Sequence, residues 1–258
     1  MTNKTIAGIA LAAGAVGLAA GKADAAKVDE AIASLKKYDW GVPRKTLDPI
    51  VDAINASHGD AAARKKLETA LLAALPGATY STQEFVCRRL RVIGTTASVK
   101  PLAALLCDEK ISHMARYALE RICCDSAVAA LSAALPKAGA KLKPGIIGSL
   151  GARRDKKSVA TIAKFLGDKD TNTAKAAAKA LALIGTPEAG KALCGCAGKA
   201  PAAIKIAVAD AGLICAEQLL ADGEKAAAIG LYKALKADSQ PKHVQVAATK
   251  GMVNAALK

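Results

Sequence analysis

Arginine is the residue whose type and spacing in this sequence best suit a binding site. Seven of the nine arginines lie between Arg88 and Arg154. The guanidinium group is planar and carries forked donors, so it can hold a carboxylate or a phosphate with two parallel hydrogen bonds. With two adjoining lysines, the candidate binding residues are Arg88, Arg89, Arg91, Arg116, Arg121, Arg153, Arg154, Lys156 and Lys157.

The charge distribution also indicates that a binding site lies in this region. The formal net charge is +15, and residues 81–170 alone carry sixteen basic against eight acidic side chains. Such a zone attracts an acidic protein or polymer through its long-range field. An alternative remains open, in which these side chains form a solvated, solubilising surface and Arg88 and Arg116 pair with acids close by.

No local motif for catalysis accompanies the arginines. The three histidines, His58, His113 and His243, are not spaced with carboxylates or cysteines as metal ligands are. The sequence has no nucleophile elbow, no phosphate-binding loop and no dinucleotide fingerprint. We therefore predict that the protein is not an enzyme and has no catalytic residue, no metal and no cofactor.

Seven cysteines are present, and an odd number leaves at least one without a disulfide partner. Cys107 and Cys123 are expected to end antiparallel helices about a helix length apart, too far for a disulfide. Most of the seven are expected to be small buried side chains. Redox or metal chemistry at Cys123–Cys124, or at Cys194 and Cys196, is the alternative.

Nucleic acid is a poor match as a partner. Only 3% of the residues are aromatic, whereas base stacking and base flipping need aromatic side chains. The single tryptophan, Trp40, is expected to plug the N-terminal part of the fold.

A short pattern of residues, which we call the recurring phrase, repeats along the chain and predicts the helices that must position the arginines. It begins at Leu90, Leu119, Ile147, Leu181 and, in degraded form, Ala211, at spacings of 29, 28, 34 and 30 residues. A period in this range indicates a stacked-repeat protein. Apolar residues at helical spacing surround each copy, and long alternating runs typical of strands are absent. The pattern predicts an all-α solenoid of paired helices.

The chain divides into three segments. Lys4, an uncharged apolar run over residues 6–20 and the small residues around Ala25 predict a signal peptide over residues 1–25, cleaved after Ala25. The apolar run is too short to span a membrane, so no stable span is expected after cleavage. Residues 26–80 read as an N-terminal helical cap, and residues 81–258 as about five to six repeats, the last one incomplete.

The repeats resemble a known family. The stretches SHMARYALERI (112–122) and GSLGARRD (148–155) are similar to those of exported bacterial HEAT-repeat proteins of the PBS-lyase HEAT-like type. Residues 223–238 are similar to the tetratricopeptide-like pair found late in such arrays. The resemblance covers roughly residues 81–258 and implies a right-handed α-solenoid of HEAT-type helix–turn–helix repeats, acting as a scaffold.

These observations predict a non-catalytic scaffold that is exported to the periplasm or outside the cell. Its centrally basic surface would bind an acidic protein or polymer, and its uncapped last repeat would allow oligomers to form. Two alternatives remain: a regulatory or accessory module of an exported enzyme, and a HEAT-like lyase or glycosylase.

Overall fold

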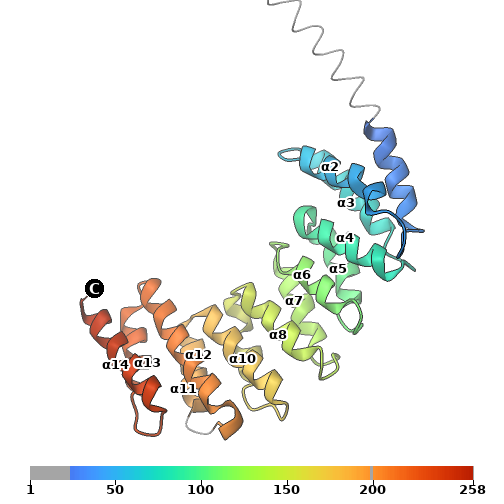
Figure 1. Ribbon diagram of the computed structural model, residues 1–258. Helices are drawn as coiled ribbons and strands as arrows, with labels where there is room; N and C mark the ends of the chain where they lie inside the picture. Colours follow the sequence, from blue (N-terminus) through green and yellow to red (C-terminus); the bar gives the residue numbers. More distant parts are fainter. Residues whose placement is uncertain (1–23, 198–199, 258) are drawn as a thin grey trace, which may run out of the picture. The chain divides into compact units, whose positions relative to one another are not determined.

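The computed structural model describes residues 24–197 and 200–257 (Figure 1). Within these ranges the chain is built of helices joined by turns and contains no β-strand. The fold is an all-α solenoid, as the repeat pattern predicts. It divides into two compact units, and the chain passes from the first to the second between Ser98 and Val99. The predicted signal peptide lies almost wholly outside the described residues.

The first unit is a small helical bundle. A helix over residues 24–35 is followed by the 3₁₀ helix η1 (Arg44–Leu47). Then come α2 (Asp48–Ala56), α3 (Ala61–Ala73), α4 (Tyr80–Ile93) and the start of α5 (Thr96–Ala104). The Asp60 carboxylate accepts a hydrogen bond from the Ala63 amide at 2.9 Å and so caps the start of α3. Helix α4 begins at Tyr80, one residue before the predicted start of the repeats, because Thr79 supplies its cap.

A buried carboxylate fastens α3 to the start of α5. Glu68 is only 3% exposed, although Glu is rarely buried without partners. It accepts hydrogen bonds from the Thr95 amide at 2.7 Å, from the Thr95 hydroxyl and from the Ser98 hydroxyl. These donors lie at the first turn of α5, where backbone N–H groups lack helical partners.

The second unit stacks helices in two layers (Figure 1). The first helices of successive repeats, α8, α10, α12 and α14, pack side by side, and α9, α11 and α13 form the second layer. The bounds are α6 (Ser112–Leu119), α7 (Asp125–Ala134), α8 (Lys143–Ala152), η2 (Lys156–Ser158), α9 (Val159–Ala163), α10 (Thr171–Ile184), α11 (Pro187–Ala197), α12 (Ala202–Ala221), α13 (Lys225–Leu235) and α14 (Lys242–Leu257).

The recurring phrase supplies the buried contacts between repeats. Its first and fourth residues are buried in the first four copies, for example Leu119 with Ile122 and Leu181 with Ile184. The degraded copy differs, because Ile214 is exposed there and the next residue is buried instead. The change follows from α12, which continues without a break through this position and turns a different face inward.

Two glycines of the phrase have different physical roles. A Cβ on Gly151 would lie 2.6 Å from the Cα of Ala180, so this glycine allows α8 and α10 to approach closely. Gly185 has a φ of 66° and ends α10 in the left-handed conformation that glycine adopts without strain. In the preceding repeat α8 continues past Gly151, and the left-handed residue is Arg154.

Two expectations about buried side chains are wrong. Trp40 is 95% exposed and does not plug the first unit. Of the seven cysteines only Cys87 and Cys215 are buried, whereas Cys107 and Cys123 are exposed. Both exposed cysteines lie in the connecting segments after α5 and α6, where the inward-facing helical periodicity no longer applies. All seven are free thiols.

Candidate functional site

The candidate basic residues lie in four places along the chain. Arg88, Arg89 and Arg91 are on α4 in the first unit. The others belong to the second unit, where they lie on α6, in the turn after it, and in the turn that follows α8.

Two of the three α4 arginines, Arg88 and Arg89, interact with neighbouring side chains of their own helix. Arg88 donates two hydrogen bonds, from Nε and Nη2, to the same carboxylate oxygen of Glu84 at 2.9 and 2.8 Å. The Arg89 guanidinium lies over the Phe85 ring, 5.3 Å from its centre. Local pairing of Arg88 was the alternative left open by the sequence, and it is what the structure shows.

Arg116 joins α6 to α8. Its Nη1 donates to the Gly145 carbonyl at 2.9 Å and to the Ser149 hydroxyl, which in turn donates to Glu120 at 2.7 Å. A Cβ on Gly145 would lie 2.6 Å from the guanidinium carbon, so glycine is needed for this approach. Burial lowers the pKa of Arg116, and the charge of Glu120 acts in the opposite direction. The side chain is therefore a packed, structural cation.

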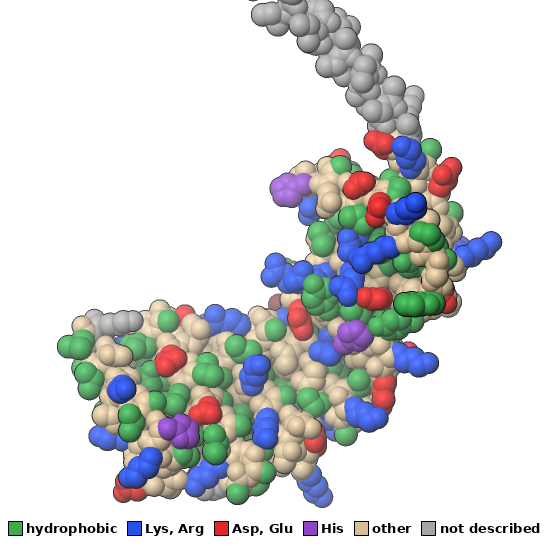
Figure 2. Space-filling view, viewed as in Figure 1, with side chains coloured by type: hydrophobic (Ala, Val, Ile, Leu, Met, Phe, Trp, Pro, Cys, Tyr) green, Lys and Arg blue, Asp and Glu red, His purple; other side chains and the backbone are tan. Residues whose placement is uncertain are grey.

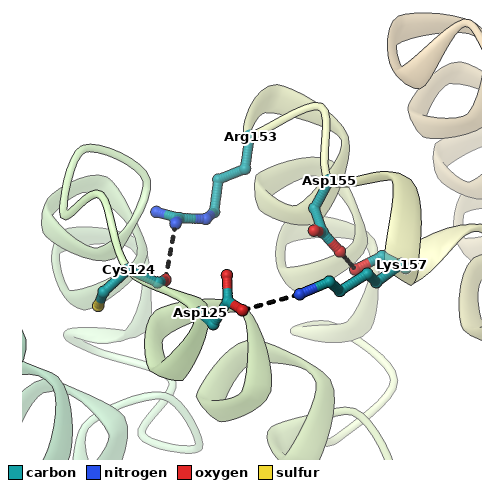
Figure 3. Close-up of polar contacts among 6 residues, drawn as sticks. Cys124, Asp125, Arg153, Asp155 and Lys157 are labelled. Atoms are coloured by element: carbon teal, nitrogen blue, oxygen red, sulfur yellow. Dashed lines mark hydrogen bonds and ion pairs between the residues drawn. The ribbon is translucent and has the colours of Figure 1, made fainter.

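Arg153 holds the turn between α6 and α7. Its Nη1 donates to the carbonyl oxygens of Leu119 and Ile122, and its Nη2 donates to the carbonyl of Cys124 at 3.1 Å (Figure 3). The last carbonyls of a helix have no partner within the helix, and a cation there also complements the helix dipole. Arg153 thus caps the preceding repeat and is drawn away from solvent.

Its neighbours point outward. Arg154 has a φ of 52°, unusual for a residue with a side chain, and its Nη2 lies 3.7 Å from the Asp222 carboxylate at the end of α12. Lys157 donates to Asp125 at 2.8 Å (Figure 3). That hydrogen bond lowers the pKa of Asp125 and raises the pKa of Lys157. Lys156 is exposed.

A shallow hollow of about 270 Å³ lies beside this turn. Asp125, Asp155 and Lys157 line it, together with residues of α7. Asp155 also accepts a hydrogen bond from the Ser158 hydroxyl at 2.7 Å, which orders the start of η2 (Figure 3). The hollow is small and partly acidic, so it suits one edge of a larger partner better than an enclosed ligand.

The predicted set therefore separates into two kinds of residue. Arg116 and Arg153 use their donors on the backbone of adjacent repeats. Arg121, Arg154, Lys156 and Lys157 remain accessible in the second unit. On the face shown in Figure 2, Lys and Arg side chains are interspersed with acidic and hydrophobic ones. Sequence reasoning missed the acidic partners Asp125 and Asp222, which lie 32 and 68 positions from the basic residues they meet.

Histidine and cysteine form no metal centre in the described part of the chain. Among residues 24–197 and 200–257 no group of three His, Cys, Asp or Glu side chains could hold a metal ion. His243 lies 3.5 Å from Asp210 in an exposed pair that links α14 to α12. None of the described helices is long and apolar enough to cross a membrane.

Comparison with known proteins agrees with the architecture. Residues 128–211, which run from within α7 into α12, match the family model of HEAT repeats. None of the curated proteins matches the chain. The chain thus combines an all-α solenoid with a central stretch similar to HEAT repeats, a type of repeat typical of protein-interaction scaffolds.

Proposed function

We propose that this protein is a non-catalytic scaffold of the cell envelope, exported by its N-terminal segment, that binds an acidic protein or polymer. The observation that carries the proposal is the turn after α8. Arg153 anchors this turn through three hydrogen bonds, and the anchored turn presents Arg154, Lys156 and Lys157 to solvent. A rigid element that displays several cations loses little conformational freedom when an anionic partner binds.

Arg154 adds a second argument. The left-handed conformation costs a residue with a side chain about 1–2 kcal/mol. At the corresponding turn of the next repeat, glycine fills this conformation without strain. Strained residues persist where their side chain is used, and the Asp222 pair is too exposed to offset this cost by itself. A role for the Arg154 guanidinium in binding a partner accounts for its presence.

Binding of poly-L-glutamate tests the proposal. The unaltered protein should bind it with an affinity that falls as salt rises. The triple variant Arg154→Glu, Lys156→Glu, Lys157→Glu should bind at least about tenfold more weakly. Each exposed charge pair that is lost removes ~0.5 kcal/mol of binding free energy, and three such losses correspond to about a tenfold higher Kd.

A matched control carries the same change in net charge elsewhere. It reverses three exposed lysines of the second unit, Lys233, Lys236 and Lys242. Equal weakening by the control and the test variant would contradict a specific site, since only net charge would then matter. Binding that ignores salt would contradict an electrostatic one.

Export and self-association belong to the same proposal. N-terminal sequencing of protein recovered from its own cells should begin at Ala26, and an intact Met1 in the cytoplasm would contradict export.

Helix α14 exposes Val246, Val253 and Leu257, which supports pairing of its outer face between copies. Sedimentation velocity should show a dimer that the variant Val253→Asp, Leu257→Asp loses, and a monomer at every concentration would refute this pairing.

A further inference from the structure

The first unit displays an exposed tryptophan on an anchored loop. Trp40 is 95% exposed, and the next residue, Gly41, has a φ of 91°. A large aromatic side chain gains free energy when it is covered, so an exposed tryptophan can contribute strongly to the binding of a partner. Tryptophan is also among the residues that most often dominate binding interfaces.

Helix α4 fixes the backbone just before this side chain. The hydroxyl of Thr79 donates to the Tyr38 carbonyl at 2.6 Å, and the hydroxyl of Thr82 donates to the Leu35 carbonyl at the same distance. The hydroxyl of Ser81 donates to the Asp39 carboxylate at 3.0 Å. Because the chain is tethered up to Asp39, the backbone that carries the indole is held in position before anything binds, which reduces the backbone entropy lost on binding.

A hollow of about 420 Å³ lies beside the indole. Its apolar lining comes from Tyr38, Trp40, Val42 and Phe85, and its charged lining comes from Asp39, Arg44, Glu84 and Arg88. The volume is enough for one or two side chains of a partner.

The charged groups of the hollow are unequally satisfied. Asp39 accepts a hydrogen bond from Ser81, and Glu84 accepts two hydrogen bonds from Arg88, so the two carboxylates are engaged. Within the described part of the chain, no hydrogen bond or ion pair engages the Arg44 guanidinium, which is exposed. The hollow therefore offers unused forked donors next to an uncovered aromatic face, and its complement is a carboxylate beside an apolar side chain.

We propose that this hollow is a docking site for an acidic peptide segment of a partner protein. An aromatic or aliphatic side chain of the segment packs against Trp40 and Phe85, and a neighbouring carboxylate binds Arg44. The site belongs to the first unit and is separate from the turn after α8, so either site can fail without the other.

The chain contains a single tryptophan, so its fluorescence reports this site directly. The probe is an acetylated, amidated six-residue peptide with a central Leu-Phe pair flanked by Asp and Glu. The comparison peptide carries Asn and Gln in their place. The full-length protein should show a blue-shifted emission that saturates with the acidic peptide, and about tenfold weaker binding of the amide peptide, as expected for loss of a charge-assisted pair.

Variants separate this site from the other. Arg44→Gln should weaken the acidic peptide to the level of the amide peptide, whereas the neighbouring exposed control Lys45→Gln should not. The triple variant at Arg154, Lys156 and Lys157 should bind the peptide normally. Circular dichroism checks that each variant is folded, which is expected because these side chains are exposed.

Three results with the peptides and with Arg44→Gln would overturn the inference, and a fourth comes from the triple variant. The first three are an emission that does not respond to the acidic peptide, equal binding of both peptides, and an Arg44→Gln variant that binds like the unaltered protein. Loss of peptide binding only in the triple variant would also overturn it, by assigning the acidic peptide to the second unit.

Discussion

Arg153 and Arg154 are adjacent arginines for which the structure predicts different effects on stability. Arg153 donates to three carbonyl oxygens of the turn between α6 and α7. Replacement by methionine keeps most of the length and apolar stem of the side chain and removes every donor. The three carbonyl oxygens can then accept hydrogen bonds only from water, and water reaches this half-buried position only in part.

The expected loss follows from these bonds. A hydrogen bond to a charged group contributes ~1.5–3 kcal/mol when buried, and partial access of water reduces this to ~1 kcal/mol for each bond. Arg153→Met should therefore lower the free energy of unfolding by about 3 kcal/mol. Arg153→Lys should lower it by about 2 kcal/mol, because an ammonium group cannot reproduce the planar fork.

Arg154→Gly is the matched control. Glycine relieves about 1 kcal/mol of left-handed strain. It also adds ~0.5–1 kcal/mol of chain entropy to the unfolded state and removes an exposed ion pair worth at most ~1 kcal/mol. These contributions nearly cancel, so stability should stay within about 1 kcal/mol of the unaltered protein.

Urea unfolding followed by far-ultraviolet circular dichroism measures all three variants. Hydrogen exchange adds a local test, since Arg153→Met should speed exchange of amides in the turn between α6 and α7. If Arg153→Met and Arg154→Gly lower the stability equally, the assignment of Arg153 as a structural cap is wrong. An unchanged exchange rate in this turn would refute it independently.

Three further predictions concern other contacts of the structure. Burial raises the pKa of Cys87 and of Cys215 to about 12, so a thiol reagent at mildly alkaline pH should leave both unmodified until the protein is denatured. Rapid native modification of either would contradict their burial. Gly151→Ala should cost about 1–3 kcal/mol in urea unfolding, because its Cβ would enter the backbone of α10; an unchanged midpoint would show that the helices separate freely. Lys157→Ala should raise the pKa of Asp125 towards its ordinary value, measured by carboxyl NMR titration, and the same pKa in both proteins would exclude the pair.

The sign of the last effect determines its pH range. The folded pKa of Asp125 is lowered, so the pair contributes stability above the pKa of the unfolded aspartate. That contribution disappears as the pH falls through the lowered pKa. Lys157 has a raised pKa, so at high pH its part is lost only as the pH rises through that value. Both side chains are exposed, which keeps the effect small.

Most of the fold could be predicted because helix formation depends on near neighbours. Apolar residues three or four positions apart form one face, and the recurring phrase repeats that face at each layer. The N-cap Asp60 and the turn glycine Gly185 follow equally local rules. Helix α12 continues past the fifth copy of the recurring phrase to Ala221, because no local breaker stops it earlier.

The candidate site could be predicted only as a set of residue types. Composition and spacing identified the arginines, but Arg116 and Arg153 interact with residues 29 to 34 positions away. Such partners are brought together by repeat stacking, which single-residue patterns do not contain. Trp40 shows the same limit, since nothing near it in the sequence indicates whether a large apolar side chain is covered.

The sequence by itself thus determined that the chain is an all-α array with a basic centre, since periodicity and charge are local or additive properties. The tertiary structure alone decided which basic residues bind the backbone of a neighbouring repeat and which face solvent. Arg153 turns inward to three carbonyls, while Arg154, one residue later, enters the left-handed conformation and points outward. The physical reason is that the backbone direction after α8 and the position of the preceding turn are set by how the repeats pack, and adjacent identical side chains then face different surroundings.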